Sequence, residues 1–230
     1  MKTPPARRSP TVSGYTRTDL LAGIAAASMV VALALSYGIH ASRKARLQQC
    51  LDNLRDVGRA VISFANDHEN TLPDSTPNLG GDLWWWYKEQ VKSYVGLTGP
   101  SSAQDRVFAC PDDRGYSDPR PFHQSARFDY GSYVFNGVTL PHMPNIAGRT
   151  TDSLPRPART LLVMEWTAHG PLSWHRSRTG RANLPFYRDA ENATSFVDGH
   201  VKFIPFYYDG YTAAFTRDPI AGYDYQYSGD

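Results

Sequence analysis

Five side chains in the second half of the chain are of the types that bind metals or transfer protons. They are Glu165, His169, His175, Asp198 and His200. Histidine and carboxylate groups are common zinc ligands, so this set invites comparison with metal-dependent hydrolases. The sequence has no His-Glu-x-x-His pair, no Gly-x-Ser-x-Gly motif and no glycine-rich phosphate loop. We therefore expect no enzymatic activity and interpret these histidines as surface and hairpin residues.

The chain contains two cysteines, Cys50 and Cys110, which are separated by about sixty residues. A disulfide between them would close a loop of that length and contribute about 4 kcal/mol through loop entropy. Two buried free thiols are the alternative, and we favour the disulfide if the domain is exported to an oxidising compartment. Two cysteines cannot form a structural zinc site without a histidine or a carboxylate.

Residues 14–68 contain no proline and are predicted to form one continuous helix. The uncharged run 20–39 would span about 30 Å as a helix, enough to cross the core of a bilayer. Half of its residues are small, with spacings of four such as Gly23 to Ala27, so neighbouring helices could approach it closely. An ordinary single-pass anchor is the alternative. Beyond the run, apolar residues recur every three or four positions from 47 to 65, which predicts a stripe that packs on a soluble surface.

Length and charge restrict the remainder of the protein. The chain has 230 residues, so about 160 remain beyond residue 68, enough for one domain. The formal net charge is +2, but removal of residues 1–14, with their three basic side chains, would change it to −1. No nucleic-acid partner is therefore expected. Basic residues flank the apolar run on both sides, so charge does not determine its orientation in a membrane.

The domain is predicted to contain a helix followed by strands. Residues 80–96 read as an amphipathic helix, and its three adjacent tryptophans, 84–86, are interpreted mainly as core residues. Strands are expected at 106–109, 131–135 and 160–166. Alternating residues around Asp198 and Gly199 predict a β-hairpin with a two-residue turn, in which Phe196 shares a face with partners drawn from Val201 and Phe203. The expected fold class is α+β, a long N-terminal helix packed on a small antiparallel sheet.

The N-terminal segment resembles the cleavage and methylation signal of type IV pilins and type II secretion pseudopilins. Gly14, Thr16, Leu20 and Leu21 match that signal, Tyr15 and Asp19 replace its Phe and Glu, and Arg17 and Thr18 stand where it has apolar residues. The resemblance implies cleavage after Gly14 by a prepilin peptidase and methylation of Tyr15. It also implies that the carboxylate of Asp19 pairs with an amine of a neighbouring subunit during assembly.

The segment 193–205 is similar to the C-terminal box of a pseudopilin-like family, in which a histidine precedes an Asp-Gly hairpin by ten residues. Arg188 occupies the position of that histidine. Some pseudopilins hold calcium in a C-terminal loop, and the tail here offers Asp209, Asp218, Asp224 and Asp230. No EF-hand loop is present, and we expect no cofactor, with calcium kept as the alternative.

Together these features predict a leader at 1–14, a membrane-spanning and polymerising helix at 15–39, an amphipathic helix at 40–68 and a globular domain at 69–230. The resemblance implies a pilin-like fold, a bacterial inner-membrane location, and a periplasmic or cell-surface domain. It further implies assembly with other pseudopilin subunits, identical or different, into a filament. The alternative is a membrane-anchored periplasmic module that binds glycans through its Trp and C-terminal Tyr residues and does not polymerise.

Overall fold

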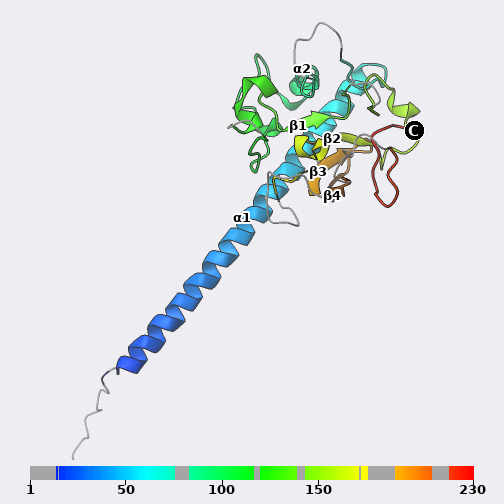
Figure 1. Cartoon of the computed structure of the whole chain (residues 1–230). Helices are drawn as coiled ribbons and strands as arrows, with labels where there is room; N and C mark the ends of the chain where they lie inside the picture. The colour runs from blue at the N-terminus through cyan, green and yellow to red at the C-terminus, as the bar shows by residue number, and fades with distance from the viewer. Residues whose placement is uncertain are drawn as a thin grey trace, which may run out of the picture. The chain divides into compact units, whose positions relative to one another are not determined.

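The computed structural model describes residues 14, 16–75, 83–116, 120–138, 143–170, 172–175, 190–208 and 218–230. The chain divides into two compact units, Met1–Ser42 and Arg43–Asp230. The second unit contains the end of the long helix α1 and all strands of the sheet (Figure 1). The leader predicted at 1–14 lies, except for Gly14, outside the described residues.

Helix α1 runs without a break from Arg17 to Asp67, as predicted. Its first turn is closed by reciprocal hydrogen bonds between Thr16 and Asp19. The backbone amide of Thr16 donates to Oδ2 of Asp19 at 2.9 Å, and the amide of Asp19 donates to Oγ1 of Thr16 at 3.2 Å. This arrangement is a capping box, which satisfies amides that have no partner inside the helix.

The two halves of α1 differ in burial. The first half contains one stretch long and apolar enough to cross a membrane, and none of that stretch is buried. Its large apolar side chains are each more than half exposed; they are Leu20, Leu21, Ile24, Met29, Val30, Val31, Leu33, Leu35, Tyr37 and Ile39. In the second half, the predicted stripe is buried in the domain through Cys50, Leu54, Val57, Gly58, Ala60, Val61 and Ala65.

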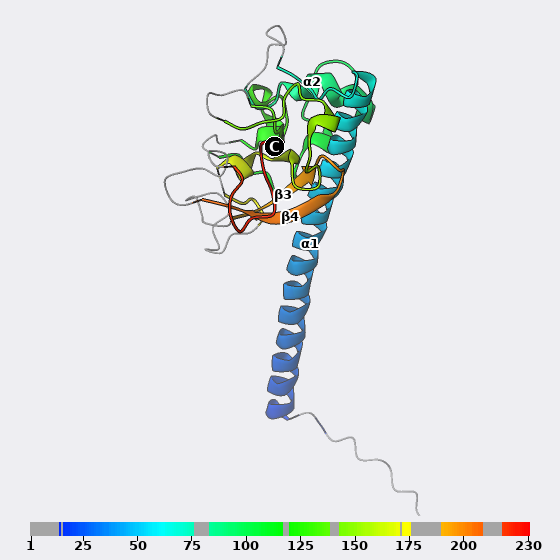
Figure 2. The same ribbon diagram turned by 90° about the vertical axis from the view of Figure 1, so that its right-hand side faces the viewer.

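The sheet has four antiparallel strands in the order β1-β2-β3-β4. The strands are β1 (Tyr133–Phe135), β2 (Leu161–Glu165), β3 (Ala190–Phe196) and β4 (Val201–Phe206). Figure 2 shows β3 and β4 beside the C-terminal half of α1. The helix approaches the sheet closely at Gly58, where an added Cβ would lie 3.2 Å from Oγ of Ser195. The predicted α+β layout of a long helix and a small antiparallel sheet is therefore confirmed.

The hairpin between β3 and β4 has a three-residue turn and not the predicted two-residue turn. Ser195 pairs with Val201, and the amide of Gly199 donates to the carbonyl of Phe196. Only Gly199 needs a positive φ, of 89°, which is the pattern of a type I turn followed by a glycine bulge. Asp198 accepts a hydrogen bond from the amide of His200 instead. The ring of Phe196 consequently stacks on His200, with ring centroids 4.2 Å apart.

Two further predictions were wrong in detail. The strand expected at 106–109 is a 3-10 helix, Arg106–Phe108, because the carboxylate of Asp105 binds the amide of Ser102 and turns the chain just before it. The helix expected at 80–96 is reduced to α2 (Tyr87–Val91) and a 3-10 turn, Lys92–Val95. Residues 83–86 form turns that direct successive tryptophan rings toward different neighbours.

The core is rich in aromatic side chains. Trp85 packs against Phe122 and Phe128, Trp86 packs against Phe135, and both tryptophans are buried. The segment around Gln226 also belongs to the core. The amide of Leu161 donates to the carbonyl of Gln226 at 3.0 Å, and the flanking Tyr225 and Tyr227 are fully buried.

Candidate functional site

A disulfide joins Cys50 of α1 to Cys110, which follows the 3-10 helix Arg106–Phe108. The two Cα atoms are 5.1 Å apart and neither cysteine is exposed. One turn further along α1, the side-chain amide of Asn53 donates to the carbonyls of Ala109, at 2.9 Å, and Arg106, at 3.2 Å. The segment that carries Cys110 is therefore held against α1 by a covalent bond and by hydrogen bonds.

The backbone at Cys110 is fixed from a second side by Ser132, the residue before β1. The amide of Cys110 donates to Oγ of Ser132 at 2.9 Å, and this hydroxyl donates to Oδ2 of Asp113 at 2.7 Å. Asp113 is buried and also accepts the amides of Gly115 and His123. These contacts hold the turn Cys110–Asp113 in one conformation.

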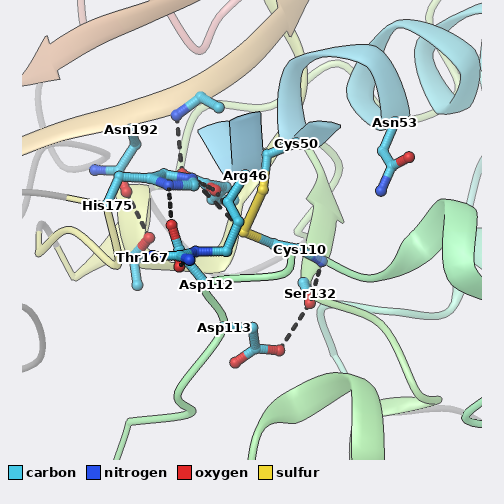
Figure 3. Close-up of polar contacts among 12 residues, drawn as sticks. Arg46, Cys50, Asn53, Cys110, Asp112, Asp113, Ser132, Thr167, His175 and Asn192 are labelled. Atoms are coloured by element: carbon cyan, nitrogen blue, oxygen red, sulfur yellow. Dashed lines mark hydrogen bonds and ion pairs between the residues drawn. A yellow bond between two sulfur atoms is a disulfide. The ribbon is translucent and has the colours of Figure 1, made fainter. Parts of the chain in front are cut away.

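His175 lies beside the disulfide between two carboxylates (Figure 3). Its Nε2 is 2.7 Å from Oε1 of Glu165, and its Nδ1 is 2.9 Å from Oδ2 of Asp112. Burial disfavours the charged imidazolium, but the attraction of Glu165 and the hydrogen bonds to both carboxylates outweigh that effect and raise the pKa of His175 to about 9. His175 is therefore a buried cation at neutral pH.

The two carboxylates have further partners. Asp112 accepts Nε of Arg46, from α1, at 2.6 Å, and Glu165 accepts the amide of Ala193, from β3, at 2.9 Å. Burial raises the pKa of Asp112, but its hydrogen bonds from His175 and Arg46 prevail and lower it below the usual value. The result is an alternating chain of two cations and two anions that connects α1, the turn after Cys110, β2 and the segment that carries His175.

This charge network touches the sulfur of Cys110. The Sγ atom lies 3.2 Å from Oε1 of Glu165 and 3.6 Å from Nε2 of His175. Among the described residues, Cys50, Cys110, Glu165 and His175 place one ligand atom each within 4.8 Å of all the others. A thiol or thiolate at Cys110 would therefore face both an acid–base pair and potential metal ligands.

The other residues that suggested a hydrolase do not join this cluster. Asp198 and His200 lie in the hairpin turn, where their side chains contact each other. His169 is buried between Trp84 and Tyr227, with ring centroids 4.3 Å and 5.9 Å away. Burial lowers the pKa of His169 to about 3, despite a hydrogen bond with the backbone of Trp166 that opposes the shift. His169 is therefore neutral where His175 is charged.

Two of the residues predicted for processing and assembly, Gly14 and Asp19, lie within the described part of the chain. Gly14 is exposed, and Asp19 takes part in the capping box. Tyr15 and Arg188 lie outside the described residues.

Among the carboxylates considered for calcium, Asp209 is also outside the described residues. Asp218 accepts the amides of Tyr227 and Ser228. Asp224 and Asp230 pair with Arg159 and Arg149. The structure does not bring these three aspartates to one site.

Sequence reasoning missed the network of Arg46, Asp112 and His175. One signal was available, because Arg46 precedes Cys50 by four residues on one helix face and Asp112 follows Cys110 by two. A disulfide between the cysteines brings these two side chains together. The position of His175 gave no such signal, because it depends on the path of a loop.

Comparisons with known proteins do not extend the assignment. No family model matches the chain, and no curated protein or solved structure shows significant similarity to it.

Proposed function

We propose that this protein is a pseudopilin-like structural subunit whose first helix half anchors it in the inner membrane and then polymerises. The observation that carries the proposal is the contrast within α1. Residues 20–39 expose every large apolar side chain, whereas beyond Arg46 the apolar face of the same helix is buried in the protein's own domain. An exposed apolar surface of this size requires lipid or other helices around it.

The small residues of the first half support helix packing in addition to lipid contact. Gly23 and Gly38 have no atoms near the position of an added Cβ, so a neighbouring helix can approach the backbone there. Together with the resemblance around Gly14, this favours a subunit that exchanges lipid for neighbouring subunits.

Asp19 has a local role that must be separated from its proposed assembly role. Its carboxylate accepts hydrogen bonds from the amide and the hydroxyl of Thr16, which stabilises the start of α1. Removal of residues 1–14 would leave this capping box intact, since both partners follow the cut. In the proposed filament, the carboxylate of Asp19 keeps its negative charge while it caps the helix, and it pairs with the amino group of the adjacent subunit.

Four of the aromatic residues considered for glycan binding favour the structural interpretation, whereas Trp84, Tyr207 and Tyr223 are only partly buried. Trp85, Trp86, Tyr225 and Tyr227 are all buried in the core, so their ring faces are not available to a sugar. We therefore propose assembly and not carbohydrate recognition.

The proposal is tested by the N-terminal sequence and mass of protein extracted from membranes of cells with an active prepilin peptidase. The expected mature chain begins at methylated Tyr15. Gly14→Val should retain residues 1–14, and the matched change Ser13→Val, next to the cut, should still be processed. Recovery of the wild-type chain with Met1 intact would reject processing and, with it, the filament.

A further inference from the structure

We propose that the reduced protein binds one zinc ion at the site of the disulfide. The oxidised protein is then crosslinked there by the disulfide, and the reduced protein by the zinc ion. The four ligands are Cys50, Cys110, Glu165 and His175. The inference is independent of filament assembly. It rests on the fact that a buried histidine and a buried carboxylate face the two cysteines, and these are the groups that two cysteines need to complete a zinc site.

The distances around Nε2 of His175 are close to those of a tetrahedral ion, once reduction lets the two sulfurs separate to about 3.8 Å. With Zn–S bonds of about 2.3 Å and Zn–N bonds of about 2.0 Å, a sulfur and a nitrogen ligand lie about 3.6 Å apart. Sγ of Cys110 and Nε2 of His175 are 3.6 Å apart already. Oε1 of Glu165 must separate from His175 by about 0.6 Å beyond its present 2.7 Å, which replacement of their hydrogen bond by metal bonds would bring about.

Three of the four ligands are oriented by neighbouring groups. Nδ1 of His175 bonds to Asp112, which leaves Nε2 directed at the cluster. Oε2 of Glu165 accepts the amide of Ala193, which leaves Oε1 directed there as well. A carboxylate behind a ligating histidine is the usual support of a zinc site. Cys110 is held through its amide by Ser132.

The exchange between the two states balances in electrons and protons. A small dithiol reductant gives two electrons and two protons to the disulfide, so that Cys50 and Cys110 become thiols and the reductant becomes a disulfide. Zinc then binds both sulfurs, Nε2 and Oε1, and the protons on the sulfurs and on Nε2 pass to solvent. Because both sulfurs are buried, the reductant reaches them when the domain is unfolded.

The experiment uses the full chain in detergent. The protein is reduced in denaturant and refolded without oxygen, with either Zn²⁺ or Co²⁺ or with no metal, and excess metal is removed. We expect about one metal per chain, and with Co²⁺ the charge-transfer absorption of a thiolate complex together with intense tetrahedral bands. The oxidised protein treated in the same way should retain no metal.

Variants assign the ligands. His175→Gln and Glu165→Gln should lose stoichiometric metal, and Asp112→Asn should weaken binding by about 10-fold to 100-fold. His200→Gln is the matched control, since that histidine lies in the hairpin turn, and it should bind like the wild type.

Three results would overturn the proposal. In the first, the reduced chain refolds but retains no metal. In the second, the reduced chain fails to refold even when zinc is present. In the third, the His175→Gln protein binds Co²⁺ with an unchanged spectrum. If refolding of the reduced chain requires zinc, that requirement itself supports the site.

Discussion

The two halves of α1 are made of the same kind of backbone and meet without a break, yet their side chains have different surroundings. In residues 20–39 every large apolar side chain is more than half exposed, whereas Cys50, Leu54, Val57 and Val61 have no exposed surface. The difference shows that one continuous helix can be buried in a folded domain along one half and exposed along the other. Its second half is stabilised by its own domain, and its first half depends on surroundings that other molecules supply.

The largest expected effect comes from removing the covalent link to the buried half. Changing Cys50 and Cys110 together to Ser should lower the free energy of unfolding by about 4 kcal/mol, because the disulfide closes a loop with a sequence separation of 60. The measurement is chemical denaturation in detergent with a metal chelator present, followed by tryptophan fluorescence. All five tryptophans lie beyond residue 83, so this signal reports the domain alone. An unchanged midpoint would mean that packing alone holds this half of α1.

A packing change should affect only one half of the helix. Leu54→Ala removes a fully buried side chain and should cost about 3 kcal/mol by leaving a cavity. Leu33→Ala, the matched change in the first half, should alter domain unfolding by less than about 0.5 kcal/mol, since Leu33 is exposed. Equal effects of the two changes on the same denaturation curve would remove the distinction between the halves.

Low pH should destabilise the domain that covers the second half of α1 but not the first half, because the domain contains the buried His169. Its pKa is about 3 in the folded protein and about 6.5 when unfolded, so the unfolded chain binds the extra proton first. The stability that neutral His169 provides is complete above pH 6.5 and is lost as the pH falls toward 3, by roughly 2 kcal/mol at pH 5. Chemical denaturation followed by circular dichroism in detergent should then show a lower unfolding midpoint of the domain at pH 5 than at pH 7, while the helix 20–39, which has no side chain that titrates in this range, is unaffected.

His169→Phe should flatten this acid dependence between pH 6.5 and pH 5, because it replaces the titrating ring by another aromatic ring. His68→Gln, at an exposed position at the end of α1, is the control and should keep the wild-type dependence. A wild-type protein equally stable at pH 7 and pH 5 would show that the environment of His169 does not oppose its charge.

The smallest effect on stability, and the one specific to the first half, is expected at Asp19. Asp19→Asn keeps an oxygen that can accept the amide of Thr16 but removes the charge. Domain unfolding and processing should be unchanged, whereas crosslinked oligomers in membranes should decrease several-fold. Asp19→Glu should assemble at least as well as the wild type. If the Asp19→Asn protein forms crosslinked oligomers as well as the wild type does, the charge of Asp19 is not needed for assembly.

Local patterns explain what the sequence predicted. The unbroken apolar and amphipathic periodicities of 14–68 predicted α1, and alternation around Asp198 and Gly199 predicted the β3–β4 hairpin, although not the length of its turn. The errors occur where tertiary contacts override local preference. Lys88, fully buried, binds the carboxylate of Asp105 at 2.9 Å, and that carboxylate turns the chain before Arg106, where a strand was expected.

The candidate site was predictable only in part for the same reason. The cysteines could be paired from their number and surroundings, and the disulfide then implies the meeting of Arg46 and Asp112. Glu165 and His175 were recognised as chemically capable residues, but their contact with Cys110 depends on the ends of a buried strand and of a loop. The periodicity of a single sequence carries no signal for such a meeting.

The burial of Tyr225 and Tyr227 has a consequence for the order in which the domain can form. The backbone carbonyl of Tyr227 accepts the side-chain amide of Asn136, which follows β1, and Gln226 bridges to Thr160, which precedes β2. This segment therefore packs beside two strands that are synthesised before it. A chain that crosses a membrane from its N-terminal side would deliver all four strands before this last piece of the core. If the domain is translocated as proposed, completion of its fold waits until residue 227 has crossed, and a tag fused close behind that point would compete with this last step.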